Sequence, residues 1–179
     1  MSKANAAKVV VLAAVVAGAL FFARYQRGPQ PLEVGDRAPD FNLPTLGSGT
    51  FALRDYRQHV VVVNFWATWC PPCIEETPSL VRFAAQMQSL GVQVVGVSVD
   101  RDEAALRKFV SDYRLTFPIA RDPDQAVASR YGTFKFPETF ILDRDGRVAE
   151  KLIGATDWQD PRIIRFIESL ARPEKRAGQ

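Results

Sequence analysis

Residues 60–73, VVVVNFWATWCPPC, contain both cysteines of this 179-residue chain, Cys70 and Cys73. The apolar run at 60–65 is typical of a short strand that is covered on both faces. Residues 74–90 follow with apolar side chains at helical spacing. The sequence therefore predicts two thiols at a strand-to-helix junction, where the pair can close into a disulfide and open again.

The position of Cys70 at the start of a helix favours disulfide exchange. A thiolate is the attacking species, and the free N–H groups and dipole of a helix N-terminus stabilise a negative sulfur. Cys73 lies one turn further along, close enough to bond Cys70 but more covered. We expect Cys70 to be the nucleophile and Cys73 the resolving thiol. Pro71 and Pro72 hold φ near the value that a helix needs. Neither has a backbone N–H, but the first turn of a helix would leave these N–H groups unpaired in any case.

Two other interpretations of the cysteine pair are a zinc site and a static disulfide. Zinc needs four ligands, usually Cys and His, and the chain offers only Cys70, Cys73 and His59. The count predicts no metal site, and we expect His59, which precedes a strand, to lie on the surface. A static bridge across so small a loop removes little chain entropy. We therefore expect the pair to serve redox chemistry.

The rest of the chain predicts an α/β fold with a mixed sheet and helices on both faces. Strand, helix and strand around the cysteines form a parallel crossover unit. The turn compositions of residues 47–49 and 143–146 favour antiparallel hairpins. Further strands are expected at 41–43, 51–53, 92–99, 117–120, 139–142 and 148–153, and further helices at 102–113, 124–131 and 163–170.

The N-terminus carries a targeting pattern. Lys3 and Lys8 precede an unbroken apolar run at residues 9–23, which Arg24 closes. The run is longer than many signal-peptide cores and shorter than a full span of roughly 20 residues. The flanking basic side chains can snorkel and extend its usable length. We expect an uncleaved signal-anchor, with cleavage near Ala17-Gly18-Ala19 as the alternative.

Changes in composition along the chain predict how it divides into segments. The Pro-containing stretch that follows the targeting segment reads as a stiff linker, and the C-terminal residues are polar. The net charge of +3 comes without a basic stripe, which argues against nucleic-acid binding. We expect a signal-anchor at 1–27, a linker at 28–32, a folded domain at 33–171 and a polar tail at 172–179.

Several motifs together resemble the thioredoxin superfamily, and within it the TlpA/ResA/CcmG branch of membrane-anchored extracytoplasmic thiol-disulfide oxidoreductases. The motifs occur in the same order: Ala38-Pro39-Asp40-Phe41, then Trp66 to Cys73 followed by Glu75-Glu76-x-Pro78, then residues 92–113, then Phe136-Pro137-Glu138-Thr139-Phe140 with Asp143-x-Asp145-Gly146. The resemblance implies a thioredoxin-like three-layer sandwich with an N-terminal hairpin and a strand-helix insertion, preceded by one transmembrane helix.

The same resemblance implies roles for residues around the cysteines. Pro137 is expected to be cis, which leaves the backbone of Phe136 free to pair with an extended partner. Trp69 is expected to pack beside Cys70 and contact substrate. Asn64 stands where thioredoxin has a buried Asp that helps to move the proton of the second cysteine. Glu138 is a candidate for this proton carrier, and the alternative is that it has a structural or solvent-exposed role. Glu75 and Glu76 are further candidates, and Trp66 is expected in the core.

The implied function is reduction of disulfides in partner proteins, such as apocytochrome c or a copper-delivery protein, with electrons from a membrane donor of the thiol-reductase type. The expected redox group is the Cys70–Cys73 disulfide itself, without a further cofactor. The expected location is the bacterial cell membrane, single-pass, with the domain on the periplasmic side; the alternative is secretion after cleavage. Rival functions are a disulfide oxidant or isomerase, a thiol peroxidase, and a tethered binding module.

Overall fold

The structure is a computed structural model that describes residues 3–25 and 31–172. The chain divides into two compact units, Met1–Gln30 and Pro31–Gln179, and each is described by itself. The predicted linker at 28–32 lies largely outside the described residues, as do Arg27 and nearly all of the predicted tail at 172–179.

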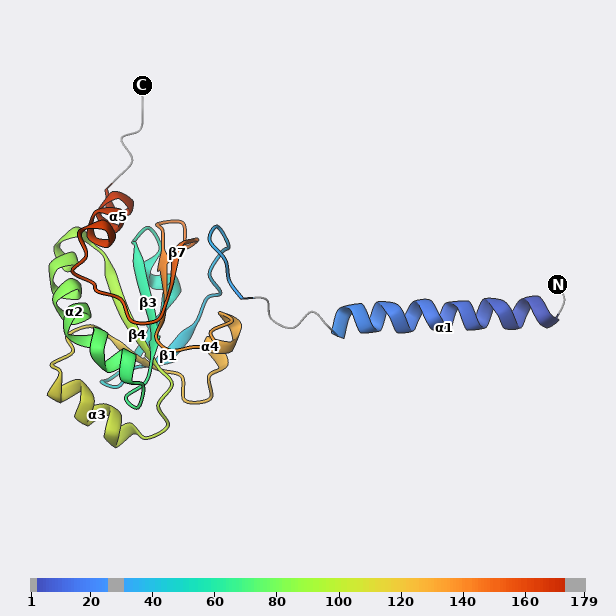
Figure 1. Ribbon diagram of the computed structural model, residues 1–179, viewed down its shortest axis with the longest axis horizontal. Coiled ribbons are helices and arrows are strands. Elements are labelled where there is room, and N and C mark those ends of the chain that lie inside the picture. Colours follow the sequence, from blue (N-terminus) through green and yellow to red (C-terminus); the bar gives the residue numbers. More distant parts are fainter. Residues whose placement is uncertain (1–2, 26–30, 173–179) are drawn as a thin grey trace, which may run out of the picture. The chain divides into compact units, whose positions relative to one another are not determined.

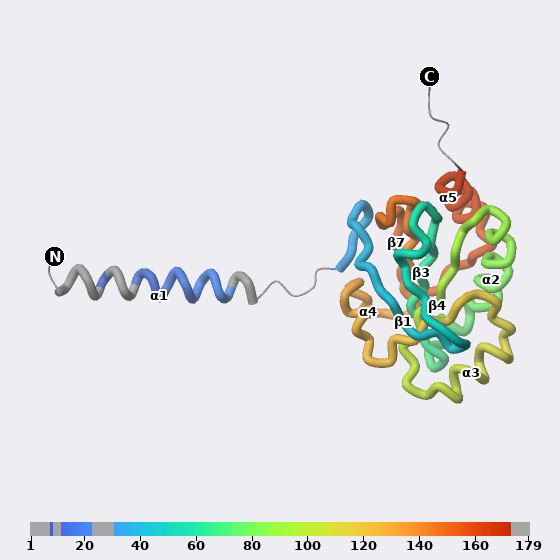
Figure 2. Tube along the Cα trace, turned by 180° about the vertical axis from the view of Figure 1, so that it is seen from behind, coloured from blue at the N-terminus to red at the C-terminus, as the bar shows by residue number. Residues whose placement is uncertain are grey.

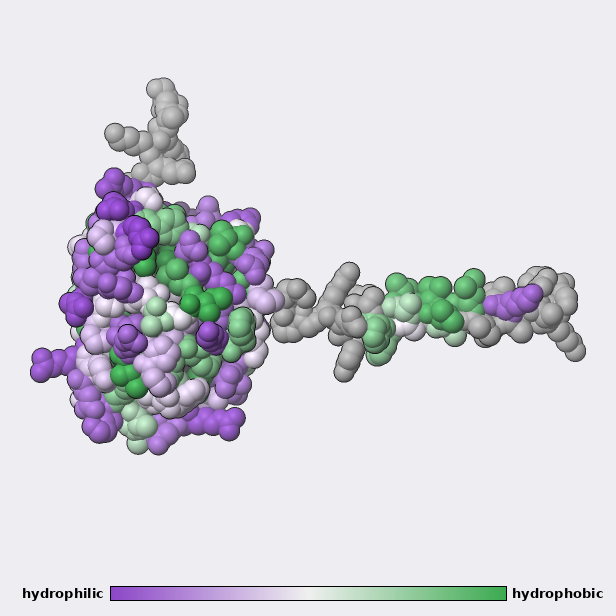
Figure 3. Space-filling view, viewed as in Figure 1, coloured by the Kyte–Doolittle hydropathy of each residue, from purple (hydrophilic) through white to green (hydrophobic). Residues whose placement is uncertain are grey.

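The N-terminal unit contains a single described helix, α1 (Lys3–Tyr25). This helix covers the whole apolar run at 9–23, and its described side chains are mostly hydrophobic and exposed (Figure 3). Among the described residues, no helix combines the length and the apolar character needed to cross a membrane. The predicted transmembrane helix is therefore not shown by the structure.

The second unit is organised on a five-stranded mixed sheet with the strand order β5-β4-β3-β6-β7. The central strand β3 pairs in parallel with β4, as the crossover unit predicts, and antiparallel with β6. The turn at 143–146 joins β6 to β7 and predicts the antiparallel pairing of these two strands. β4 pairs in parallel with β5, and β6 pairs antiparallel with β7. The strands are β3 (Val61–Trp66), β4 (Gln93–Ser98), β5 (Ile119–Arg121), β6 (Glu138–Leu142) and β7 (Val148–Ile153).

Helices cover both faces of this sheet (Figure 1). The alternation of side chains along β3 shows why. Val62 packs in one core cluster with α2 (Pro71–Met87) and α5 (Pro161–Ala171). Val61 and Val63 point to the opposite face, where they pack in a second cluster with α3 (Glu103–Asp112) and α4 (Ala126–Arg130). The predicted α/β fold is confirmed. Two short 3-10 helices complete the described elements: η1 (Leu53–Tyr56) comes directly after β2 (Thr50–Ala52), and η2 (Gln88–Leu90) comes directly after α2.

A separate two-stranded hairpin, β1 (Asn42–Pro44) and β2 (Thr50–Ala52), confirms the hairpin predicted around residues 47–49. Its buried aromatic residue Phe51 joins the core cluster of α3 and α4. Thr45, after β1, forms an isolated bridge with Ala120 of β5, and Figure 2 shows β1 close to the central strands. The hairpin therefore closes this face of the domain.

The first residues of the domain are bonded close to the segment that leads into Pro137. Leu32 donates its N–H to the carbonyl of Tyr131 at 3.3 Å and accepts from Lys151 Nζ at 3.2 Å. Gly132 adopts a positive φ of 68°, and a Cβ there would collide with the backbone of Pro31. Residues 31–32, at the N-terminal end of the domain, therefore pack against and hydrogen-bond to residues 131–132.

Gly96 of β4 gives a test of packing in this core. A Cβ at this position would lie 2.8 Å from Trp66 Nε1 and 3.2 Å from side-chain carbons of Phe117 and Ile119. We expect Gly96→Ala to lower the free energy of unfolding by about 1–3 kcal/mol, because the buried neighbours must shift. Urea unfolding measures this change. Gly47→Ala, where no atom lies within 4 Å of the added Cβ, is the control and should change stability by less than about 0.5 kcal/mol.

Candidate active site

The two cysteines form a disulfide at the N-terminus of α2. Cys70 is the N-cap residue, and its Sγ accepts the N–H of Cys73 at 3.3 Å. Pro71 and Pro72 occupy the first two helical positions, so α2 begins at Pro71, three residues before the predicted start. Cys70 and Cys73 are 5% and 1% exposed, respectively. A sulfur that already accepts a helix N–H is placed where negative charge on it is stabilised.

The loop before β6 supplies the neighbouring surface. The Phe136–Pro137 peptide bond is cis, which confirms that prediction. The ring of Phe136 meets that of Trp69 edge to face, with centroids 6.1 Å apart, and Trp69 is 63% exposed. The carbonyl of Pro137 accepts the N–H of Gly154 at 2.8 Å. Within the described part of the chain, no backbone hydrogen bond engages Phe136, so its N–H and C=O are available to another chain.

A buried hydrogen-bond network connects α2 to the sheet beneath the disulfide. Asn64 of β3 donates from Nδ2 to Glu76 Oε1 at 2.8 Å and to Thr139 Oγ1 at 2.9 Å. The other oxygen of Glu76 accepts from the backbone N–H of Thr156 at 3.1 Å and from Trp158 Nε1 at 3.4 Å. Asn64 therefore binds a carboxylate, and the ionisable group of this network is Glu76.

Burial decides the acidity of Glu76, which lies three residues after Cys73 on α2 and is 3% exposed. Desolvation raises the pKa of its carboxyl from 4.5 to about 6, although hydrogen bonds from Asn64, Thr156 and Trp158 oppose the shift. Side chains three residues apart on a helix are neighbours. A buried carboxyl with a pKa near neutrality beside the second cysteine is suited to exchanging a proton at physiological pH.

Glu138, the other candidate proton carrier, has different surroundings. Its side chain is fully buried, with Oε1 3.0 Å from Nζ of the almost buried Lys151. Its other oxygen accepts the N–H of Phe134 at 3.3 Å, within the loop that precedes Pro137. Lys151 thus matches the charge of Glu138, and Glu138 holds the loop. The exchange of protons at Glu138 remains a prediction, whereas the geometry at Glu76 favours the alternative.

The remaining predicted residues are placed as follows. Trp66 is 3% exposed and packs in the core, as expected. His59 is exposed, and Glu75 is exposed on α2. Among the described residues, no cluster of three or more His, Cys, Asp or Glu side chains could hold a metal ion.

Sequence reasoning missed the partners that surround the carboxylates. Lys151 occupies an ordinary strand position, and only its register opposite Phe140 brings it beside Glu138. Trp158 and Thr156 lie in a loop after β7 with no pattern that points to Glu76. The sequence did offer Glu76 as a candidate, through the Glu75-Glu76-x-Pro78 motif that follows Cys73.

Thiol-disulfide exchange requires a disulfide that a partner can approach, a sulfur stabilised as thiolate and a backbone edge that holds the partner. The N-terminus of α2 and the loop around Phe136 supply these three requirements on a thioredoxin-like sheet. Fold and site together define the class of thioredoxin-like thiol-disulfide oxidoreductases.

A family model described as the AhpC/TSA family matches residues 34–151, and the chain belongs to this family. The chain is 32% identical over 148 residues to the thiol-disulfide oxidoreductase ResA of Bacillus thuringiensis (strain Al Hakam), covering 81% of this chain and 86% of the relative. It is 33% identical over 162 residues to ResA of Geobacillus thermodenitrificans, covering 90% and 92%. The crystal structure of a DsbE-type thiol:disulfide interchange protein from Chlorobium tepidum superimposes with a TM-score of 0.73 at 32% identity, covering 79% and 99%. The chain is a thiol-disulfide oxidoreductase of the ResA/DsbE type.

The raised pKa of Glu76 predicts a pH dependence of stability. Between about pH 4.5 and pH 6 the folded protein keeps a proton on Glu76 that the unfolded chain releases, so stability falls as pH rises through this window. The expected loss is about 2 kcal/mol between pH 4 and pH 7. Urea unfolding of the oxidised protein at both pH values should show this loss in the wild type and not in Glu76→Gln.

Glu75→Gln, at the exposed neighbouring position, is the matched control and should retain the wild-type pH dependence. The assignment of the titration to Glu76 fails if Glu76→Gln loses as much stability over this pH range as the wild type.

Proposed function

We propose that the protein reduces disulfides of partner proteins through Cys70 and Cys73. The observation that carries the proposal is the disulfide at the N-terminus of α2 beside a cis-proline loop, in which the Phe136 backbone has no hydrogen bond to any other described residue. An extended segment of a partner can pair with this backbone and present its own disulfide to Cys70. Trp69 and Phe136 form the aromatic wall of this approach.

In the proposed cycle the reduced protein supplies two electrons. The Cys70 thiolate attacks one sulfur of the partner disulfide, a mixed disulfide forms, and the other partner sulfur leaves as a thiolate. Cys73 then loses its proton and attacks Cys70, which restores the Cys70–Cys73 disulfide and releases the second partner sulfur. The partner gains two electrons and two protons, and the protein becomes oxidised.

Glu76 is the group that we propose accepts the proton of Cys73. At pH 7 a carboxyl with a pKa of about 6 is mostly ionised, yet it holds a proton easily enough to deliver it again. Cys73 and Glu76 are both buried and lie three residues apart on α2, a spacing that makes side chains neighbours on a helix. Glu138 is the second candidate, and its pairing with Lys151 favours a structural role.

The resemblance to the TlpA/ResA/CcmG branch supports the finer points. It favours reductive work in an oxidising compartment, on partners such as apocytochrome c or a copper-delivery protein, with a membrane thiol reductase as the electron donor. A disulfide oxidant or isomerase would use the same site with the opposite electron flow. The peroxidase alternative lacks support in the motif before Cys70, because Val63 and Ala67 stand where peroxiredoxins have Pro and Thr or Ser.

The reduction potential of the Cys70–Cys73 pair tests the direction. Equilibration of the full-length protein with dithiothreitol or glutathione should give a value nearer to roughly −270 mV, the thioredoxin range, than to about −120 mV, the DsbA range. Under reducing conditions the wild type should reduce insulin disulfides, and Cys70→Ser should lose this activity. Cys73→Ser should accumulate a mixed disulfide through Cys70.

A potential near −120 mV would assign the protein to oxidants instead. If Cys70→Ser retains insulin reduction while its fold is intact by circular dichroism, the assignment of the nucleophile fails. Peroxide consumption supported by dithiothreitol, measured on the same preparation, separates the peroxidase alternative.

We also propose that the apolar N-terminal segment exports the domain and tethers it to the bacterial membrane. The run at residues 9–23 with Lys8 and Arg24 at its ends supports a signal-anchor. Full-length protein expressed in a bacterium should sediment with membranes, resist extraction by carbonate, and be digested by protease added to spheroplasts. Recovery of a shortened chain in the periplasmic fraction would instead establish cleavage near Ala17-Gly18-Ala19.

A further inference from the structure

Asp100 is a buried carboxylate that lies just beyond the carboxyl end of β4 and is 2% exposed. Within the described part of the chain it forms no ion pair with a Lys or Arg side chain. Burial of a carboxylate is costly unless hydrogen bonds compensate for the lost water. The donors that surround Asp100 therefore show what it does.

Most of these donors belong to Thr68, two residues before Cys70. The hydroxyl of Thr68 donates to Asp100 Oδ1 at 2.6 Å, and its backbone N–H lies 3.0 Å from Oδ2 and 3.2 Å from Oδ1. One side chain thus holds both the main chain and the side chain of Thr68. The two residues are 32 positions apart in sequence, so this contact fastens the loop before Cys70 to a neighbouring strand.

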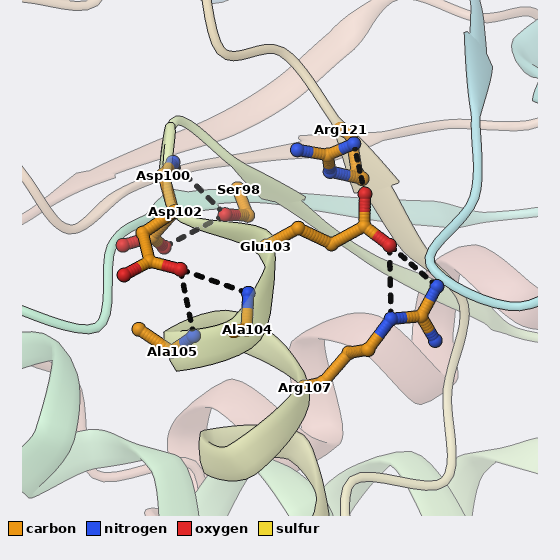
Figure 4. Close-up of polar contacts among 8 residues, drawn as sticks. All are labelled: Ser98, Asp100, Asp102, Glu103, Ala104, Ala105, Arg107 and Arg121. Carbon is orange, nitrogen blue, oxygen red and sulfur yellow. Dashed lines mark hydrogen bonds and ion pairs between the residues drawn. The ribbon is translucent and has the colours of Figure 1, made fainter.

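Asp100 is itself fixed to the sheet. Fully buried Ser98, the last residue of β4, donates its hydroxyl to Asp100 Oδ2 at 2.8 Å, and its Oγ accepts the Asp100 N–H at 3.1 Å (Figure 4). The intervening Val99 donates its N–H to the carbonyl of Trp66 at 3.1 Å. These bonds give Asp100 a rigid base from which to hold Thr68.

Thr68 lies inside the turn that delivers Cys70 to the helix. The N–H of Cys70 donates to the carbonyl of Ala67 at 3.3 Å, so Thr68 and Trp69 are the two central residues of this turn. Fixing Thr68 fixes the turn, and with it the approach of Cys70 Sγ to the N–H of Cys73.

The neighbouring acidic residues have other tasks. Asp102 caps α3, because its Oδ1 accepts the N–H groups of Ala104 and Ala105 at 2.9 and 3.0 Å. Glu103 points away toward Arg107 and Arg121 (Figure 4). Asp100 alone among these three acidic residues turns toward the loop that carries the nucleophile.

We propose that Asp100 is a positioning residue for thiol-disulfide exchange, which acts through Thr68 to hold Cys70 at the N-terminus of α2. The stabilisation that a helix N-terminus gives to an anion falls off within one turn. A looser turn would therefore weaken the stabilisation of the Cys70 thiolate without removing any group that touches the partner. The proposal rests on Cys70 being the nucleophile, and its test separates the two claims.

The test compares Thr68→Val and Thr68→Ser in the full-length protein. Thr68→Val removes the hydroxyl bond to Asp100 without a change of charge. We expect it to raise the pKa of the Cys70 thiol by about half a unit and to slow insulin reduction at pH 7 roughly two- to fivefold. Thr68→Ser keeps the hydroxyl and should restore both values. The pH dependence of iodoacetamide alkylation, with the modified cysteine identified by mass spectrometry, gives the pKa.

Two further variants separate positioning from general stability. In an Asp100→Ala background the bond is already absent, so Thr68→Val should add little to the change in pKa and rate. Asp102→Ala removes an equal charge two residues away together with the helix cap. It should lower the melting temperature while leaving the pKa and the rate unchanged.

The proposal is overturned if Thr68→Val lowers the melting temperature but leaves the Cys70 pKa and the rate at their wild-type values, or if Thr68→Ser is impaired as much as Thr68→Val. If Cys73 rather than Cys70 is the thiol that titrates and is alkylated first, the nucleophile assignment fails, and the positioning role fails with it.

Discussion

The hydrogen bond from the Cys73 N–H to Cys70 Sγ is the contact on which the rest of the site depends. It exists because a buried strand, β3, ends where a helix begins, so that a side chain at the junction meets unpaired N–H groups. The sheet sets the position of this junction, and Pro71 and Pro72 occupy the first two positions of the helix, directly after Cys70. The fold thereby brings a sulfur atom to a place where charge on it is tolerated.

Two buried glutamates beside this junction show how surroundings determine the chemistry of one residue type. Glu138 lies against Lys151, so its charge is matched and its oxygen is committed to the backbone of Phe134. Glu76 has uncharged donors only, and burial raises the pKa of its carboxyl to about 6. The first arrangement suits support of a loop, and the second suits exchange of a proton.

Local patterns in the sequence were sufficient for the fold. Apolar runs placed β3 and β4, turn composition placed the hairpins, and helical spacing placed α3 and α5. The cysteines and Pro137 could be located from their motifs. Lys151, Thr139 and Trp158 could not, because their roles arise from strand register and from a loop that returns to α2 after more than 70 residues. The choice between Glu76 and Glu138 depends on those partners, and therefore on tertiary structure.

The attachment of Leu32 has a mechanical consequence. Its N–H is bonded to Tyr131 and its carbonyl to Lys151, and Lys151 in turn pairs with Glu138 beside Pro137. A force applied at Leu32 would therefore act first on these hydrogen bonds and on the ion pair beside the cis-proline loop. The start of the domain and the backbone edge around Phe136 therefore depend on the same few bonds, those of Leu32, Lys151 and Glu138.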